Sequence, residues 1–305
     1  MVRSVTTLRS VPLLAGICLL MHGTVAAQFA RVACPEPGLL VVAHGADSTW
    51  NARVREVMTM VDWDGPVELA FLMGPASRTD SWTAGVGRLA AHGARCAVAV
   101  PLMVSSHGAH VRQMRFYAGE LDEMPAGLGG MDHGAHGTTG NAIPVSVTAA
   151  LDGAPELGRI LADRLAADGR ASGDGPVVLV AHGPSGAADV AGWVEGLDAA
   201  IEPIRVTFPG RTLRIGLLRD DAEPAVRDSA VKSLRDLISS LARASGDSVT
   251  VLTVLVSSGE IDRIRVPADL AGMPMRYVGS VLAPHPELAG WITRIARAHR
   301  AAPPL

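Results

Sequence analysis

The sequence predicts an α/β protein made of two tandem lobes, each a parallel sheet flanked by helices in a flavodoxin-like arrangement. An apolar run over residues 39–43 leads directly into His44-Gly45, which is typical of a buried parallel strand that turns sharply at its carboxyl end. The same pattern returns at residues 177–183, where an apolar run leads into His182-Gly183. Strand and helix patterns alternate after both runs, which favours parallel sheets joined by right-handed crossovers. We therefore predict a duplicated α/β protein with a histidine at the edge of each sheet.

The elements of the first half follow from hydrophobic spacing and from residues that break it. Val54, Val57, Met58 and Val61 have helical spacing, and Gly65-Pro66 ends that helix. The predicted order is strand 39–43, helix 50–61, strand 67–73, helix 83–91, strand 96–104, helix 111–121, strand 143–151 and helix 155–167. The glycine-rich residues 125–140 are predicted to form a loop.

The second half repeats this order after a glycine-rich linker over residues 169–175. The predicted order is strand 177–181, helix 187–201, strand 212–218, helix 224–244, strand 249–256, strand 275–282 and helix 286–299. Three matched motifs support duplication: His-Gly after each first strand, Ser-Ser after residues 104 and 256, and Pro-Glu-Leu at 155–157 and 286–288. The predicted domains are therefore residues 37–168 and residues 176–300.

Composition narrows the class of function. The chain has 305 residues and a net charge of -3, which gives no electrostatic reason to expect a nucleic-acid partner. Aromatic residues make up 4%, which argues against surfaces that stack bases. No phosphate-binding loop, Gly-x-Ser-x-Gly or His-Glu-x-x-His motif is found, so nucleotide use, serine hydrolase and zincin chemistry lack support.

The first 27 residues resemble a secretory signal peptide. Arg3 and Arg9 precede an apolar run over residues 11–21, and Val25 and Ala27 supply the small residues of a cleavage site. We predict export to the periplasm or the medium, with no membrane attachment after cleavage; the alternative is an uncleaved anchor. The oligomeric state is left open, a homo-oligomer included.

Two cysteines remain after residue 27, and an exported compartment permits a disulfide between them. Cys34 precedes the first predicted strand, and Cys96 opens the strand over residues 96–104. If these strands are parallel neighbours, both cysteines lie at the same sheet edge. We predict a Cys34–Cys96 bridge; the alternative is two reduced thiols, with Cys96 as a small buried apolar residue.

The candidate chemistry lies where strands end, because ligands of open α/β sheets bind beyond the carboxyl ends of strands. His44 follows the first strand, and His107 and His110 follow the third, which we expect to be its neighbour. Neutral imidazole is a common ligand of Co²⁺, Fe²⁺, Ni²⁺ and Zn²⁺. We predict that His44 and either His107 or His110 hold one exchangeable metal ion, and the sequence leaves that choice open.

Other polar residues are weaker candidates. In the second half Gly259 stands where the first has His107, so His182 has no predicted imidazole partner, and Glu260 is the candidate carboxylate. Asp47 and Asn51 can cap a helix or touch a substrate, and capping is favoured. His133 and His136 in the glycine-rich loop can capture metal weakly or remain solvated, and His285 between two prolines is predicted to be structural.

The residues around these histidines resemble the class II chelatases of the sirohydrochlorin cobalt and iron type. The stretch LLVVAHGADSTWNARV resembles the opening of these proteins, VAVPLMVSSHGAHVRQMRF their second signature, and VLAPHPELAGWI the start of their closing helix. The resemblance covers about residues 37–299, in two copies, as in the long two-domain members, and it implies two lobes that face each other across a cleft.

This resemblance implies an ATP-independent lyase that inserts Co²⁺ or Fe²⁺ into a sirohydrochlorin-like tetrapyrrole, with Ni²⁺ left open and no nucleotide cofactor. The family's two metal-handling histidines match His44 and either His107 or His110. The metal is a substrate, and pyrrole protons must leave as it enters, so Glu260 is a candidate acceptor. Arg112 or Arg115 can meet the carboxylates of the macrocycle, or lie on a solvated helix face.

The export signal favours two further hypotheses. One is an exported carrier that binds metal without catalysis. The other is an exported protein that binds a tetrapyrrole without inserting metal.

Overall fold

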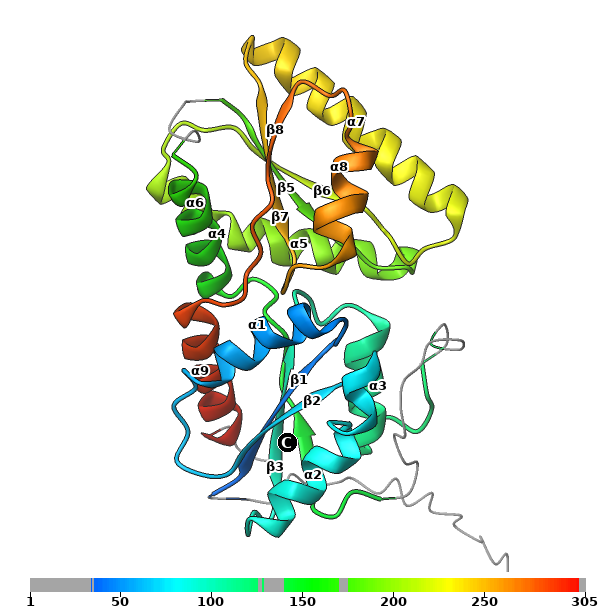
Figure 1. Ribbon diagram of the computed structural model, residues 1–305, viewed down its shortest axis with the longest axis vertical. Helices are drawn as coiled ribbons and strands as arrows, with labels where there is room; N and C mark the ends of the chain where they lie inside the picture. Colours follow the sequence, from blue (N-terminus) through cyan, green and yellow to red (C-terminus); the bar gives the residue numbers. More distant parts are fainter. Residues whose placement is uncertain (1–33, 35, 126–127, 129–139, 170–174, 302–305) are drawn as a thin grey trace, which may run out of the picture.

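The computed structural model describes residues 34, 36–125, 128, 140–169 and 175–301, which form two α/β lobes (Figure 1). Each lobe contains a four-stranded parallel sheet, of order β2-β1-β3-β4 in the first and β6-β5-β7-β8 in the second. The first and third strands of each half are therefore neighbours, as predicted. Their carboxyl ends lie side by side, because Ala43 of β1 pairs with Leu102 of β3.

The predicted strands and main helices are confirmed, with boundary shifts of a few residues. The first half comprises β1 (Gly38–Ala43), α1 (Ser48–Met58), β2 (Val67–Phe71), η1 (Pro75–Arg78), α2 (Trp82–Ala91), β3 (Ala97–Leu102), α3 (Ala109–Ala118), β4 (Val145–Val147) and α4 (Pro155–Ala167). The second comprises β5 (Val177–Ala181), η2 (Ala187–Asp189), α5 (Val190–Ala200), α6 (Glu202–Thr207), β6 (Leu213–Leu217), α7 (Pro224–Ser245), β7 (Val249–Val254), η3 (Ile261–Arg265), α8 (Val266–Asp269), β8 (Met275–Val278) and α9 (Pro286–Ala301).

The short elements η1, α6, η3 and α8 were not predicted. Each spans between four and six residues, too few for a hydrophobic period to be recognised. The predicted helix over residues 187–201 ends at Ile201. Helix α6 follows α5 directly through this residue. Pro203 within the first turn of α6 is compatible with a new helix start.

The last helix of each half packs in the other half's lobe. Helix α9 lies against β3 of the first sheet, whereas α4 lies against α5, α6 and β7 of the second (Figure 1). One apolar core accordingly contains Leu39 and Val98 of the first sheet, Trp291 of α9, Leu161 of α4 and Leu179 of the second sheet. The predicted domains, 37–168 and 176–300, divide the chain by sequence order. In the structure α4 and α9 are exchanged between the lobes, which the sequence did not indicate.

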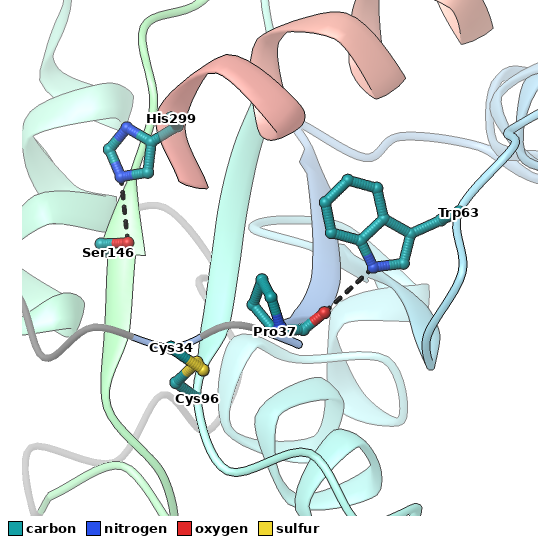
Figure 2. Close-up of a disulfide and its surroundings, with 6 residues drawn as sticks. All are labelled: Cys34, Pro37, Trp63, Cys96, Ser146 and His299. Carbon is teal, nitrogen blue, oxygen red and sulfur yellow. Dashed lines mark hydrogen bonds between the residues drawn. A yellow bond between two sulfur atoms is a disulfide. The ribbon is translucent and has the colours of Figure 1, made fainter. Parts of the chain in front are cut away.

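The predicted disulfide is present. Cys34 and Cys96 are bonded, with Cα atoms 6.3 Å apart, within the usual range (Figure 2). The bridge fixes the segment before β1 to the start of β3, because those two strands are parallel neighbours. Trp63 Nε1 also donates to Pro37 O over 3.0 Å, and His299 of α9 contacts Ser146 Oγ of β4 (Figure 2).

Two predictions fall on residues outside the described ranges: the signal peptide over residues 1–27, and the loop histidines His133 and His136. Within the described ranges, no helix has the length and apolar character needed to cross a membrane.

Candidate functional site

His44 lies at the carboxyl end of β1 and is held by its own turn. Its Nδ1 is 2.9 Å from Gly45 O, and a carbonyl oxygen accepts only, so Nδ1 carries the hydrogen. Gly45 has φ of +85°, and a Cβ there would lie 2.4 Å from Met73 O, so the turn requires glycine. Asn51 closes the same turn by bonding both N and O of Ala46. The neutral ring therefore keeps the Nε2 lone pair available for a ligand.

His110, in the first turn of α3, faces His44. The ring centroids are 4.9 Å apart and the planes meet at 83°. Gln113 donates through Nε2 to Tyr117 Oη, so its Oε1 is placed to accept from His110 Nδ1 at 3.2 Å. In the neutral form of His110 the hydrogen is therefore on Nδ1, and Nε2 carries the lone pair, as in His44. Of the two alternatives for the second imidazole, the structure brings His110 to His44.

His107 points to the other lobe. A Cβ added to Gly192 of α5 would lie 2.4 Å from its ring, so the imidazole packs on that helix. Trp193 Nε1 of the same helix donates to His107 O over 2.5 Å. Gly108 and Ala109 separate the two histidines, and α3 starts between them. The structure therefore does not bring His107 to the His44–His110 pair.

The second lobe repeats the His44 turn in detail. His182 Nδ1 is 2.8 Å from Gly183 O, and Gly183 has φ of +75°. The backbone N–H of Arg219 donates to His182 O over 2.7 Å, as that of Met73 does to His44 O over 2.8 Å. His182 Nε2 lies 3.4 Å from Asp221 Oδ2, so its acceptor nitrogen faces a carboxylate.

Asp220 and Asp221 follow β6, the strand beside β5, and with His182 they offer donor atoms within 4.8 Å of one another. Asp220 is buried and already neutralised by two guanidinium groups, with Arg227 Nε 2.9 Å from Oδ1 and Arg265 on Oδ2. Asp221 is the more exposed carboxylate, and its contact is with His182.

The electrostatics keep His44 neutral. Burial, and then the neighbouring His110, lower the pKa of His44 to about 4, against a weaker raising effect of its bond to Gly45. His182 and Asp221 also act on this pKa, in opposite directions, so the second lobe's pair lies within electrostatic range of His44. At neutral pH the His44 ring can therefore bind a cation without first losing a proton.

Glu260, the carboxylate suggested from the sequence, is paired with an arginine of its own lobe. Its carboxylate accepts from Arg265 Nε over 3.1 Å, and the side chain is 63% exposed. Arg265 also binds Asp220. The carboxylate in contact with His182 is that of the next residue, Asp221.

Of the remaining candidates, Arg112, Asp47 and His285 have structural partners. Arg112 of α3 makes a two-pronged bond to Asp189 of the second lobe, at 2.9 and 3.0 Å. Arg115 has a buried Nε with no hydrogen-bond partner among the described residues. Asp47 caps α1 by accepting from Trp50 N, as favoured from the sequence, and also pairs with Arg263. His285 Nδ1 accepts from Glu287 N at the start of α9, consistent with the structural role predicted for it.

Sequence reasoning missed Asp221. The signal was present, because two carboxylates follow an apolar strand that neighbours the His182 strand, and carboxyl ends of parallel strands meet at one sheet edge. The Ser-Ser repeat, in contrast, points to Glu260, which follows β7.

Fold and site together define a two-lobed α/β protein that presents paired imidazoles near the junction of its lobes, of which that of His44 is kept neutral by burial and by His110. A family model described as CbiX matches residues 38–168. No curated protein matches the sequence.

Solved structures share the fold over most of the chain. SirB from Bacillus subtilis with Fe³⁺ aligns with a TM-score of 0.57 and 18% identity, over 87% of this chain and 96% of that one. The sirohydrochlorin chelatase SirB from Bacillus subtilis subspecies spizizenii in complex with cobalt aligns at 0.56 and 15% identity, over 86% and 94%. DR2241 from Deinococcus radiodurans, a multi-domain protein with structural similarity to chelatases, aligns at 0.51 and 15% identity, over 86% of this chain and 55% of that one.

The match to the CbiX model over the first half and the two-lobed fold shared with the SirB structures agree with the resemblance to class II chelatases that the sequence motifs indicated. The family match itself lies in the first half, which carries His44 and His110.

Proposed function

We propose that the protein inserts Co²⁺ or Fe²⁺ into a sirohydrochlorin-like tetrapyrrole without ATP. The observation that carries this proposal is the His44–His110 pair, in which both rings have Nδ1 placed to donate and Nε2 left as an acceptor. Imidazole nitrogens suit Co²⁺ and Fe²⁺, and two ligands leave the ion open to exchange. The metals in the two SirB structures, Fe³⁺ and cobalt, support the same choice of elements.

The reaction exchanges one divalent ion for two pyrrole protons. The metal–imidazole bonds at His44 and His110 break as metal–pyrrole bonds form, and both protons must reach a base or water. His44 is a poor base, because burial and His110 hold its pKa at about 4. We assign proton acceptance to His182 with Asp221, since the carboxylate 3.4 Å from Nε2 can share a proton that the ring accepts.

We also propose that the protein acts after export, on a tetrapyrrole present outside the cytoplasm. The Cys34–Cys96 bridge supports this location, because disulfides persist in oxidising compartments and are rare in the cytosol.

A metal-insertion assay tests the proposal. Purified protein is mixed with sirohydrochlorin and Co²⁺ or Fe²⁺ under anaerobic conditions, and the absorption change is compared with the spontaneous rate. We expect acceleration that is lost in His44→Ala and in His110→Ala. Tight metal binding with no acceleration for any tetrapyrrole tried would instead support the carrier hypothesis.

A further inference from the structure

A small cavity lies where the two lobes are connected, apart from the histidine pair. It has a volume of about 240 Å³, and its lining includes Arg53 of α1, Arg164 of α4, and residues 279–281 and 284 of the segment that runs from β8 to α9. No aspartate or glutamate is among its lining residues. The proposed function uses none of these residues.

The cavity contains two guanidinium groups and no carboxylate to neutralise them. Arg164 donates to the carbonyl oxygens of Val281 at 3.0 Å, Leu282 at 3.3 Å and Pro284 at 2.6 Å, which orients the group without cancelling its charge. Burial, and then the charge of Arg53, lower the pKa of Arg164. The nearest acid that acts on it, Asp163, has its own partner in His285 at 3.3 Å.

The guanidinium group of Arg53 and the hydroxyl of Ser280 have no partner among the described residues. The Arg53 guanidinium makes no hydrogen bond or ion pair with any residue in the described ranges, and Ser280 Oγ is buried with no hydrogen-bond partner there. A buried hydroxyl without a partner is unfavourable, and most such groups in proteins are satisfied by protein, water or ligand. The cavity is therefore lined by two cations and by a serine whose hydroxyl has no described partner, a lining that suits an oxyanion.

We propose that this cavity is a binding site for a small oxyanion, a carboxylate or a phosphate, held by Arg53, Arg164 and Ser280. Its volume is below the roughly 300–1,000 Å³ of sites for drug-sized ligands, so it fits a small anion rather than a tetrapyrrole. Arg53 belongs to α1 of the first lobe. Arg164 belongs to α4, which packs on the second lobe, and Ser280 follows β8 of the second sheet. A bound anion therefore links the two lobes.

Calorimetry on the metal-free full chain tests this site. Inorganic phosphate and succinate are titrated separately, at constant ionic strength in a zwitterionic buffer, so the two sources of oxyanion are distinguished. We expect one equivalent of at least one probe to bind, and the affinity to fall about tenfold in Arg53→Gln and about threefold in Ser280→Ala. Because no metal or tetrapyrrole is present, the result is independent of the chelatase proposal.

Arg243→Gln serves as the control for net charge, because Arg243 is exposed at the end of α7 and its described contact is with Ser240. This variant should bind the anion like the wild type, and circular dichroism confirms that each variant is folded. The proposal is overturned if the wild type binds neither probe, or if Arg53→Gln binds as tightly as Arg243→Gln.

Discussion

The imidazole rings of His44 and His110 meet edge to face, with centroids 4.9 Å apart. His44 follows β1, and His110 lies in the first turn of α3, which follows β3. The pair therefore depends on β1 and β3 being adjacent and parallel. Each ring has its Nδ1 beside an acceptor oxygen, at Gly45 and at Gln113. The fold thus prepares two nitrogen ligands before any metal arrives.

The buried state of His44 predicts a specific loss of stability in acid. The pKa of His44 in the folded chain is about 4, below the ordinary histidine value of 6.5, so between these values the unfolded chain binds a proton at His44 that the folded chain does not. The free energy of unfolding should therefore fall as the pH drops from about 6.5 to about 4, by at most about 3 kcal/mol from this residue. Above pH 6.5 the residue adds no pH dependence.

Urea unfolding of the wild type and of His44→Gln across pH 4–7.5 isolates this contribution. The difference in unfolding free energy between the two proteins should change across that interval and be flat above it. Equal pH dependence in both proteins would show that His44 titrates normally.

Asp221 and Glu260 should differ in their effect on turnover. If His182 and Asp221 accept the pyrrole protons, Asp221→Asn should lower the insertion rate about 100-fold, within the range of general base catalysis. Glu260→Gln should change the rate less than about twofold, because that carboxylate is 63% exposed and paired with Arg265. Insertion rates at saturating metal compare the two; a larger loss in Glu260→Gln would restore the acceptor assigned from sequence.

Most of the fold could be predicted from the sequence, because β1, β3, β5 and β7 are apolar runs that lead into His-Gly or Ser-Ser and the longer helices have regular spacing. The exchange of α4 and α9 could not be predicted. Both helices are amphipathic, and an apolar face does not indicate which sheet the helix covers. The choice between His107 and His110 also depends on tertiary packing and could not be predicted. The motif at residues 105–110 offers two histidines, and the direction of each ring depends on where α3 begins and on how close Gly192 of the other lobe comes.

The Cys34–Cys96 bridge should contribute measurably to stability. It closes a loop with a sequence separation of 62, for which the chain-entropy model gives a stabilisation of up to about 4 kcal/mol. Reductant should lower the urea midpoint of the wild type. The double variant Cys34→Ser/Cys96→Ser should have the lower midpoint from the start and should not respond to reductant. A wild-type midpoint that reductant leaves unchanged would contradict a stabilising role.

The central claim is that His44 and His110, and not His107, hold the metal. Titration of Co²⁺ into the wild type, His110→Ala and His107→Ala, followed by calorimetry and by the visible absorption of the bound ion, tests it directly. The two variants remove the same side chain from positions three residues apart, so each controls for the other. We predict that His110→Ala weakens binding at least about tenfold, because one of two ligands is lost, and that His107→Ala stays within about twofold of the wild type. Weakened binding in His107→Ala together with normal binding in His110→Ala would contradict the account.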